Sequence, residues 1–241
     1  MIQTIADLHV HTNASQHAYS TLYENVLAAA KCGLKMIANT DHGPALPDSP
    51  HIWKISKQYK LPDSAEGVRI LRGAEANIVD FNGGLDIPDE ILSQLEWVIA
   101  SLHTYVIEPG TFDQHTACWI EIAENPRVDL IGHCEDLRYD FDHRAVVSAL
   151  RDNQKILEVN NNSFLRRAGS LDNLRSILKL CIQYQVPVAV NSDAHFCSDV
   201  GRHGPALKFL EEMDFPVQLV VNGTGEALDY YLKQYRGRQL N

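Results

Sequence analysis

Seven short apolar segments recur along the 241-residue chain, and helical patterns separate them. Apolar runs of four to six residues are typical of strands buried on both faces, as in a parallel sheet. Parallel strands need a crossover, which is usually a helix. The pattern therefore predicts an α/β fold with strands at residues 3–8, 36–39, 69–74, 97–101, 128–131, 156–159 and 186–190.

Apolar residues at helical spacing predict the crossovers, and Gly33 fits the end of the first one. We expect helices at residues 21–32, 113–125, 143–153, 171–185, 206–213 and 225–235, and a short extra strand at 218–221. So many βα units in one uninterrupted series favour a parallel barrel. Periodicity does not settle whether the sheet closes, so a doubly wound open sheet is the alternative.

Histidines and carboxylates fall at the ends of these predicted strands. In parallel α/β folds the carboxyl ends of the strands lie at one edge of the sheet, and sites are built there. Residues far apart in sequence should therefore converge. The residues at or near strand ends are His9, His11, His42, Glu75, His103, His133, Asp193 and His195.

Two of these histidines, His9 and His11, are two residues apart, so a strand projects both from one face. Asp193 and His195 repeat this spacing near the far end of the chain. Neutral imidazoles suit zinc, iron and manganese. With His17 added there are nine candidate ligands, too many for one tetrahedral ion. They suffice for two or three ions if a carboxylate bridges.

The composition of the chain excludes some classes of partner and favours one cellular compartment. The formal net charge of −10 argues against a duplex nucleic-acid surface, which needs a basic stripe. The five cysteines have unrelated spacings, which is typical of a reduced, cytoplasmic protein. The N-terminal residues show no signal-peptide pattern, and no apolar run is long enough to span a bilayer. We therefore expect a cytoplasmic protein with no membrane partner.

Six short motifs, taken in order, resemble those of the PHP (polymerase and histidinol phosphatase) family. Each motif is weakly specific alone, but the ordered set covers nearly the whole chain. Together with the segment at residues 158–164, the chain length makes it most similar to the stand-alone, YcdX-type phosphatases of that family. The motifs are Asp7-Leu8-His9-Val10-His11, Thr40-Asp41-His42, Gly73-Ala74-Glu75, Ser101-Leu102-His103, Gly132-His133 and Asn191-Ser192-Asp193-Ala194-His195.

The resemblance implies a single PHP domain over residues 1–241, folded as a distorted seven-stranded (β/α)7 barrel with a trinuclear site at the C-terminal ends of the strands. The metals are usually zinc, with manganese and iron as alternatives. By motif, the first ion takes His9, His11, Glu75 and Asp193; the second takes Glu75, His103 and His133; the third takes His17, His42 and His195. Relatives also suggest a trimer as the homo-oligomer.

The reaction expected from this resemblance is hydrolysis of a small phosphate monoester by a metal-bound hydroxide. Glu75, Asp193 and His195 are the predicted catalytic residues. Arg166 and Arg167 follow the sixth strand, where either guanidinium suits a phosphate oxygen. A solvated loop is the plainer interpretation of these two arginines. Asp41, next to His42, is a candidate for orienting an imidazole.

Three other functions stay open. PHP modules attached to DNA polymerases cut nucleic acid, so a phosphodiesterase or exonuclease is the alternative enzyme, although the acidic composition makes a nucleic-acid partner the weaker prediction. Degenerate PHP modules resemble non-catalytic, metal-binding regulatory proteins, but here all nine ligand positions are filled. Amidohydrolase-type barrels also use strand-end histidines. We find no lysine placed as their bridging carbamate.

Overall fold

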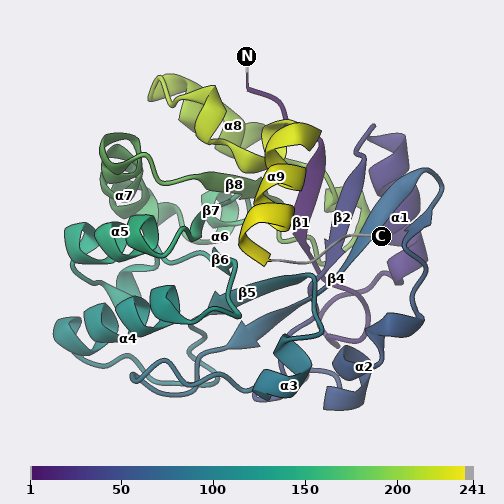
Figure 1. Cartoon of the computed structure of the whole chain (residues 1–241), viewed down its shortest axis with the longest axis horizontal. Helices are drawn as coiled ribbons and strands as arrows, with labels where there is room; N and C mark the ends of the chain where they lie inside the picture. Colours follow the sequence, from purple (N-terminus) through teal and green to yellow (C-terminus); the bar gives the residue numbers. More distant parts are fainter. Residues whose placement is uncertain (1, 237–241) are drawn as a thin grey trace.

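The computed structural model describes residues 2–236, and its centre is a curved parallel sheet that forms a nearly closed barrel (Figure 1). The strand order follows the chain, β1-β2-β4-β5-β6-β7-β8, as expected for successive βα units. The two-residue β3 (Ser64–Ala65) pairs antiparallel with β4 at the edge of this path. The parallel strands are β1 (Ala6–Val10), β2 (Met36–Asn39), β4 (Val68–Asn77), β5 (Trp97–Ser101), β6 (Leu130–Ile131), β7 (Ile156–Asn160) and β8 (Val188–Asn191).

The longer helices, of nine residues or more, lie close to the ranges that the sequence predicts. Capping boxes from Thr21 and Thr111 fix the first turns of α1 and α4, because each hydroxyl accepts from the backbone three residues on. The helices are α1 (Leu22–Lys31), α2 (Ile52–Ser56), α3 (Asp89–Leu92), α4 (Phe112–Glu124), α5 (His143–Asp152), α6 (Ser163–Arg166), α7 (Leu171–Tyr184), α8 (Gly204–Glu212) and α9 (Gly225–Arg236).

The barrel interior is packed with side chains. Its inward apolar residues, such as Leu8, Leu71 and Trp97, form one cluster with residues of α9. Figure 1 shows α9 lying across the ring of strands. Tyr231 of α9 packs its ring against Trp97, with centroids 6.2 Å apart, and its hydroxyl donates to the Asp129 carbonyl. Because Trp97 begins β5 and Ala6 begins β1, α9 closes the end of the barrel where strands begin. The opposite end is left for the site.

The extra strand predicted at residues 218–221 is wrong. That segment forms two 3-10 turns, η5 (Val217–Leu219) and η6 (Val221–Gly223), with only an isolated bridge from Val220 to Val188. Asn222 in η6 lies between β1 and β8. Its Nδ2 donates to the carbonyls of Ala6 (2.9 Å) and Val190 (2.7 Å), and its Oδ1 accepts from the Val190 N–H. The Asn222 side chain thus makes the backbone hydrogen bonds that a strand at this position would have made.

The first and last strands of the sheet are neighbours at this seam, as the sequence predicts. β1 and β8 share an isolated bridge between Val10 and Ala194, where the His11 N–H donates to the Ala194 carbonyl at 2.9 Å. Across the rest of the seam, side chains make the bonds. The Leu8 N–H, for example, donates to Asn191 Oδ1. The seam therefore holds the first and last strands of the sheet together directly beneath the candidate site.

The pairing of β1 with β2 shifts register between Asp7 and Val10, where β1 has one residue more than its partner. An extra residue of this kind reverses which face the following side chains occupy. Leu8 faces the barrel interior, yet His9 and His11 also point inward, while Val10 packs outside with α1. Strict alternation from Leu8 would have sent both histidines outward.

No helix within residues 2–236 is both long enough and apolar enough to cross a bilayer.

Candidate metal centre

The nine residues that the sequence predicts as ligands gather at the carboxyl end of the barrel. Glu75, at an inward position of β4, is fully buried and lies at their centre. Its Oε2 is 2.7 Å from His42 Nδ1, 3.3 Å from His9 Nε2 and 3.5 Å from His11 Nε2. Its Oε1 is 3.1 Å from the Nε2 of His133 and 3.4 Å from that of His103.

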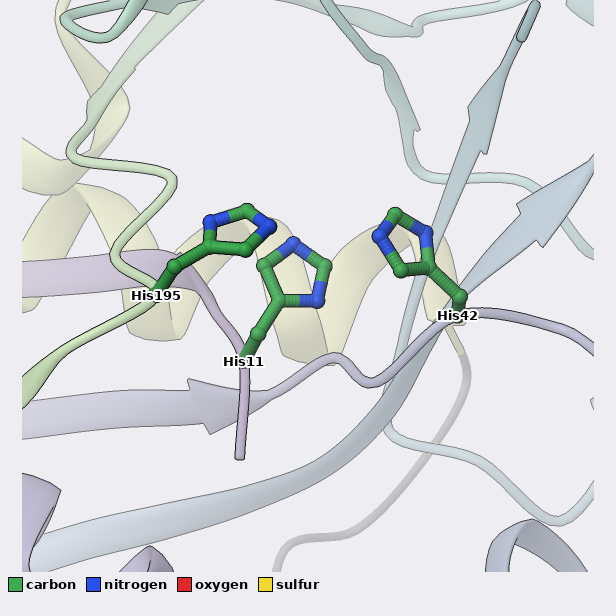
Figure 2. A group of neighbouring side chains, drawn as sticks. All are labelled: His11, His42 and His195. Carbon is green, nitrogen blue, oxygen red and sulfur yellow. The ribbon is translucent and has the colours of Figure 1, made fainter. Parts of the chain in front are cut away.

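Three groups of side chains in this cluster bring one potential ligand atom each to within 4.8 Å of one another. One is His9, His11 and Asp193, and another is His42, Glu75 and His103. The third is His11, His42 and His195. Figure 2 shows these three rings side by side with His11 in the middle, and its centroid is 4.3 Å from that of His42 and 4.4 Å from that of His195.

His17 lies at the outer edge of the cluster. Its ring centroid is 4.6 Å from that of His195 and 5.1 Å from that of His42, yet its side chain is 40% exposed. Its Nδ1 is 2.6 Å from Asp48, in the loop after β2. His17 therefore sits where the buried cluster meets solvent.

Four of these imidazoles donate their Nδ1 proton outward to an oxygen. The acceptors fix the tautomer and leave Nε2 with a free lone pair. The Nε2 atoms of His9 and His103 consequently face Glu75. The acceptors are Glu158 for His9 (2.7 Å), Asn77 for His103 (2.8 Å), the Asp193 carbonyl for His195 (2.9 Å) and Asp48 for His17 (2.6 Å).

The donor atoms at the centre fit a divalent cation. His9 Nε2 and His11 Nε2 are only 3.1 Å apart, so lone pairs converge there. Glu75 Oε2 and His42 Nδ1, although near each other, are buried without a hydrogen-bond partner among the described residues, as is His11 Nδ1. Buried polar atoms are normally paired. Imidazole nitrogens and carboxylate oxygens are ligands that zinc accepts.

The two central carboxylates stay ionised. Burial on its own raises a carboxyl pKa, but the facing imidazoles outweigh it. His9, His42 and His103 hold the pKa of Glu75 well below its ordinary value. His9 and the hydrogen bond from His11 do the same for the pKa of Asp193. Both side chains therefore carry the negative charge that a metal ion needs from its ligands.

The pKa values of the imidazoles shift in different directions, according to the charged groups next to each ring. Burial lowers the pKa of His11, and the nearby rings of His42 and His195 lower it further. Burial also brings the pKa of His103 down to about 4. For His9, burial is outweighed by Glu158 and Glu75, which raise its pKa well above the usual value. A ligand imidazole must be neutral, so metal binding would compete with protonation of His9.

Glu158 of β7 is a residue whose role the sequence does not reveal, although a lone carboxylate in an apolar strand is unusual. It is fully buried behind the cluster and accepts four hydrogen bonds. Oε1 accepts from His9 Nδ1 (2.7 Å) and Asn191 Nδ2 (2.9 Å). Oε2 accepts from the His133 N–H (2.9 Å) and Asn160 Nδ2 (3.0 Å). Glu158 therefore ties the ends of β1, β6 and β8 to β7.

Two of the clustered residues have left-handed backbone conformations. His133 has a φ of 28° and Asp193 a φ of 55°, a region that side chains other than glycine rarely adopt. Such strain persists only where the surroundings enforce it. The bond from the His133 N–H to Glu158 and those from Asn160 and Asn162 to Asp193 Oδ2 provide that support.

We expect Glu158→Gln to weaken metal binding about 10- to 100-fold, the usual effect of losing a partner that orients a ligand. Whichever way the new amide turns, its NH2 group meets two donors. His9 can then adopt the tautomer that protonates Nε2. Equilibrium dialysis against zinc measures the change, and Glu124→Gln on the exposed end of α4 is the control. Unchanged affinity in Glu158→Gln would contradict this role.

Asp41 was expected to orient an imidazole, but its carboxylate instead contacts the loop after β1. Its carboxylate accepts from the Thr12 backbone and hydroxyl (2.8 and 2.7 Å) and from the Ser15 hydroxyl (3.0 Å). Ser15 Oγ in turn accepts from the His42 N–H. Asp41 thus fixes the backbone that carries His11 and His42.

An open cleft of ≈ 990 Å³ leads to the cluster. His42, His103, His133, Asp193 and His195 lie in its wall, so the buried ligand set is reachable from solvent. Three arginines also line it: Arg166, Arg167 and Arg202. Arg167 Nε lies 3.8 Å from Asp136, and Arg202 pairs with Asp199 at 3.0 Å. The Arg166 guanidinium has no ion pair within residues 2–236.

The fold and the cluster place the chain among β/α-barrel proteins with a histidine-rich site at the strand ends. The PHP domain family model matches residues 7–162. A relative from Acetivibrio thermocellus, described as a probable phosphatase, is 42% identical over 234 residues and covers 97% of both chains. One from Clostridium novyi, described in the same words, is 40% identical over 230 residues and covers 95% of this chain and 94% of its own. The chain therefore belongs to the PHP family.

Among solved structures, the chain resembles histidinol phosphate phosphatase from Lactococcus lactis, whose crystals contain zinc, L-histidinol and phosphate. The TM-score is 0.57 at 15% sequence identity, and the match covers 89% of this chain and 95% of the other. At this identity the similarity concerns the fold: it confirms the predicted barrel.

Proposed function

We propose that the chain is a metal-dependent phosphatase that hydrolyses a small phosphate monoester at a trinuclear centre. The observation that carries the proposal is the convergence of seven imidazoles and two ionised carboxylates in one cluster that opens to solvent through the cleft. Membership of the PHP family, and relatives described as probable phosphatases, support phosphoester chemistry. The zinc in the Lactococcus lactis enzyme supports the choice of metal.

In this proposal Glu75 would bridge two ions, because each of its oxygens faces a different set of imidazoles. His9, His11 and Asp193 would complete the first set, and His103 and His133 the second. The third ion would take His17, His42 and His195. Divalent ions in such a centre polarise phosphoryl oxygens and bring the pKa of water towards neutrality.

The protein side chains then bind and orient. Arg166, which has no ion pair within residues 2–236, and Arg167 both line the cleft, so either guanidinium suits the non-bridging oxygens of the phosphate. The backbone carbonyl of Asp193 accepts from His195 Nδ1, so one predicted catalytic residue orients the ring of the other. Glu75, the third, fixes the spacing of the imidazoles around it.

Purified protein loaded with zinc or manganese should hydrolyse p-nitrophenyl phosphate. Exhaustive chelation should abolish turnover, because the ions supply several kcal/mol of charge stabilisation in the transition state. His9→Ala combined with His195→Ala removes ligands from two sets and should also abolish it. Release of p-nitrophenol at 405 nm is a direct assay on the order of minutes.

Four results would overturn the proposal. Retained activity after chelation, or in the double variant, would exclude the metal centre as the site of reaction. Three bound ions with no turnover on any phosphate ester would indicate a metal-binding regulatory protein. Cleavage of single-stranded DNA as fast as the monoester would indicate an exonuclease.

A further inference from the structure

The mouth of the cleft carries an unusual amount of exposed apolar surface. Tyr105 is 83% exposed, Tyr19 75%, Leu165 74% and Phe196 49%, and all four line the cleft. We call these four residues the apolar rim. They come from four different segments: the loops after β1, β5 and β8, and helix α6. Single exposed apolar residues are common on proteins, but a group that surrounds one opening indicates a binding surface.

The side chains that line the cleft therefore differ in chemical character between its base and its mouth. Its base holds the imidazoles and carboxylates, whose partners are metal ions and phosphate oxygens. Its mouth holds three aromatic rings, and Arg166 and Arg202 line the same cleft. A phosphate held at the base points the alcohol part of the ester outward, towards the rim. The rim thus contacts the leaving group rather than the phosphate.

The rim chemistry favours a flat, aromatic leaving group. Aromatic side chains stack on planar rings, and arginine guanidinium groups stack on them as well. Stacking needs no particular hydrogen-bond pattern and tolerates solvent at one edge, which suits side chains as exposed as Tyr105 and Tyr19. A polyol such as a ribose alone offers no such face and would be served better by buried polar groups.

We propose that the apolar rim binds a planar heterocycle in the leaving group, so that the preferred substrates are nucleoside monophosphates rather than simple sugar phosphates. The proposal rests on the phosphatase function proposed above. Tyr105 and Phe196 are the specificity-determining residues, because ordering a rigid aromatic ring costs little conformational freedom. Arg166 serves the phosphate, and Arg202 with its Asp199 partner borders the ring.

The test compares adenosine 5′-monophosphate with ribose 5-phosphate. Both are esters of the same ribose 5-hydroxyl, and they differ at the base. Stacking energies of one base on protein side chains correspond to about a 10- to 100-fold higher kcat/KM for the nucleotide. Release of inorganic phosphate measures both rates with the full-length, metal-loaded protein.

Substitutions in the apolar rim test whether these residues cause the preference for the nucleotide. Tyr105→Ala and Phe196→Ala should each reduce the ratio of the two kcat/KM values, and the double variant should bring it close to one. Tyr105→Phe retains the ring and should retain the ratio. Tyr59→Ala is the matched control, because Tyr59 is 61% exposed in η1 (Gln58–Lys60) and does not line the cleft.

The outcomes separate this proposal from the one on which it rests. Equal kcat/KM values for the two esters, with hydrolysis of both, would overturn the role of the rim and leave the phosphatase intact. A nucleotide preference that survives the double rim variant would also overturn it. No hydrolysis of either ester or of p-nitrophenyl phosphate would instead refute the phosphatase function.

Discussion

Glu75→Gln should lower phosphatase turnover by about 10³-fold and reduce the number of bound metal ions. Glutamine keeps the shape of the side chain but removes the charge that five imidazole nitrogens face. If Glu75 bridges two ions as proposed, its loss should remove about 4 kcal/mol of the stabilisation that bound ions give to a phosphoryl transition state, and each 1.36 kcal/mol is tenfold in rate. Steady-state kinetics and metal analysis of the same preparation measure both effects.

Glu96→Gln is the control for this substitution. Glu96 is 14% exposed and pairs with Arg72 at 3.1 Å, just before β5 and away from the cluster. It therefore reports the cost of losing a half-buried carboxylate without touching the site. Folding should be checked by circular dichroism, because Glu75 is fully buried. Full activity and a full complement of metal in Glu75→Gln would show that this carboxylate is not a ligand.

The convergence of the cluster could be predicted from the sequence because one rule governs it. The carboxyl ends of parallel strands lie at one edge, so residues that follow separate strands meet there. Glu75 and His133 are 58 positions apart in the chain, yet their side chains are 3.1 Å apart. The same rule makes neighbours of His9 and Asp193, from opposite ends of the chain.

The inward direction of His9 and His11 follows from a feature that the sequence does not reveal. The expectation that both share one face of a strand is correct, but which face depends on the shift of register between Asp7 and Val10. No residue in this segment marks the shift, because it is enforced by neighbours: the Asp41 carboxylate holds the Thr12 backbone, and Thr40 Oγ1 accepts from the Val10 N–H. Long-range hydrogen bonds of this kind have no local pattern.

The residues that orient the ligands were the hardest to predict. Asp41 was expected beside an imidazole because it precedes His42, whereas the residue that performs this role for His9 is Glu158, 149 positions away. Asn77 likewise orients His103, because its Nδ2 group is used by the Gly43 carbonyl and Asp86, which leaves Oδ1 to accept. Sequence proximity is a poor guide to such contacts, since they depend on which strands lie side by side.

The seam between β1 and β8 carries the largest expected effect on stability. Asn222 is fully buried there, and its side chain pairs with three backbone groups: the Ala6 carbonyl and both the N–H and the carbonyl of Val190. A buried backbone group left unpaired costs about 1–3 kcal/mol. Asparagine can serve all three because its amide offers two donors and an acceptor.

Asn222→Ala should therefore lower the free energy of unfolding by about 4 kcal/mol, and the melting temperature by about 8 to 16 °C for a domain of this size. Urea unfolding followed by circular dichroism measures the first, with an unchanged m-value showing that the folded state is intact. Asn173→Ala is the control, because that side chain makes one exposed bond, 3.3 Å to Asp140, and its loss should cost less than about 0.5 kcal/mol. Equal stability of the two variants would show that the barrel closes without Asn222.

Saturating zinc should restore part of the stability that Asn222→Ala loses, because a metal that binds only the folded state stabilises it. The proposed ligands come from β1 and from the segment after β8, so bound zinc would hold the two sides of the seam together.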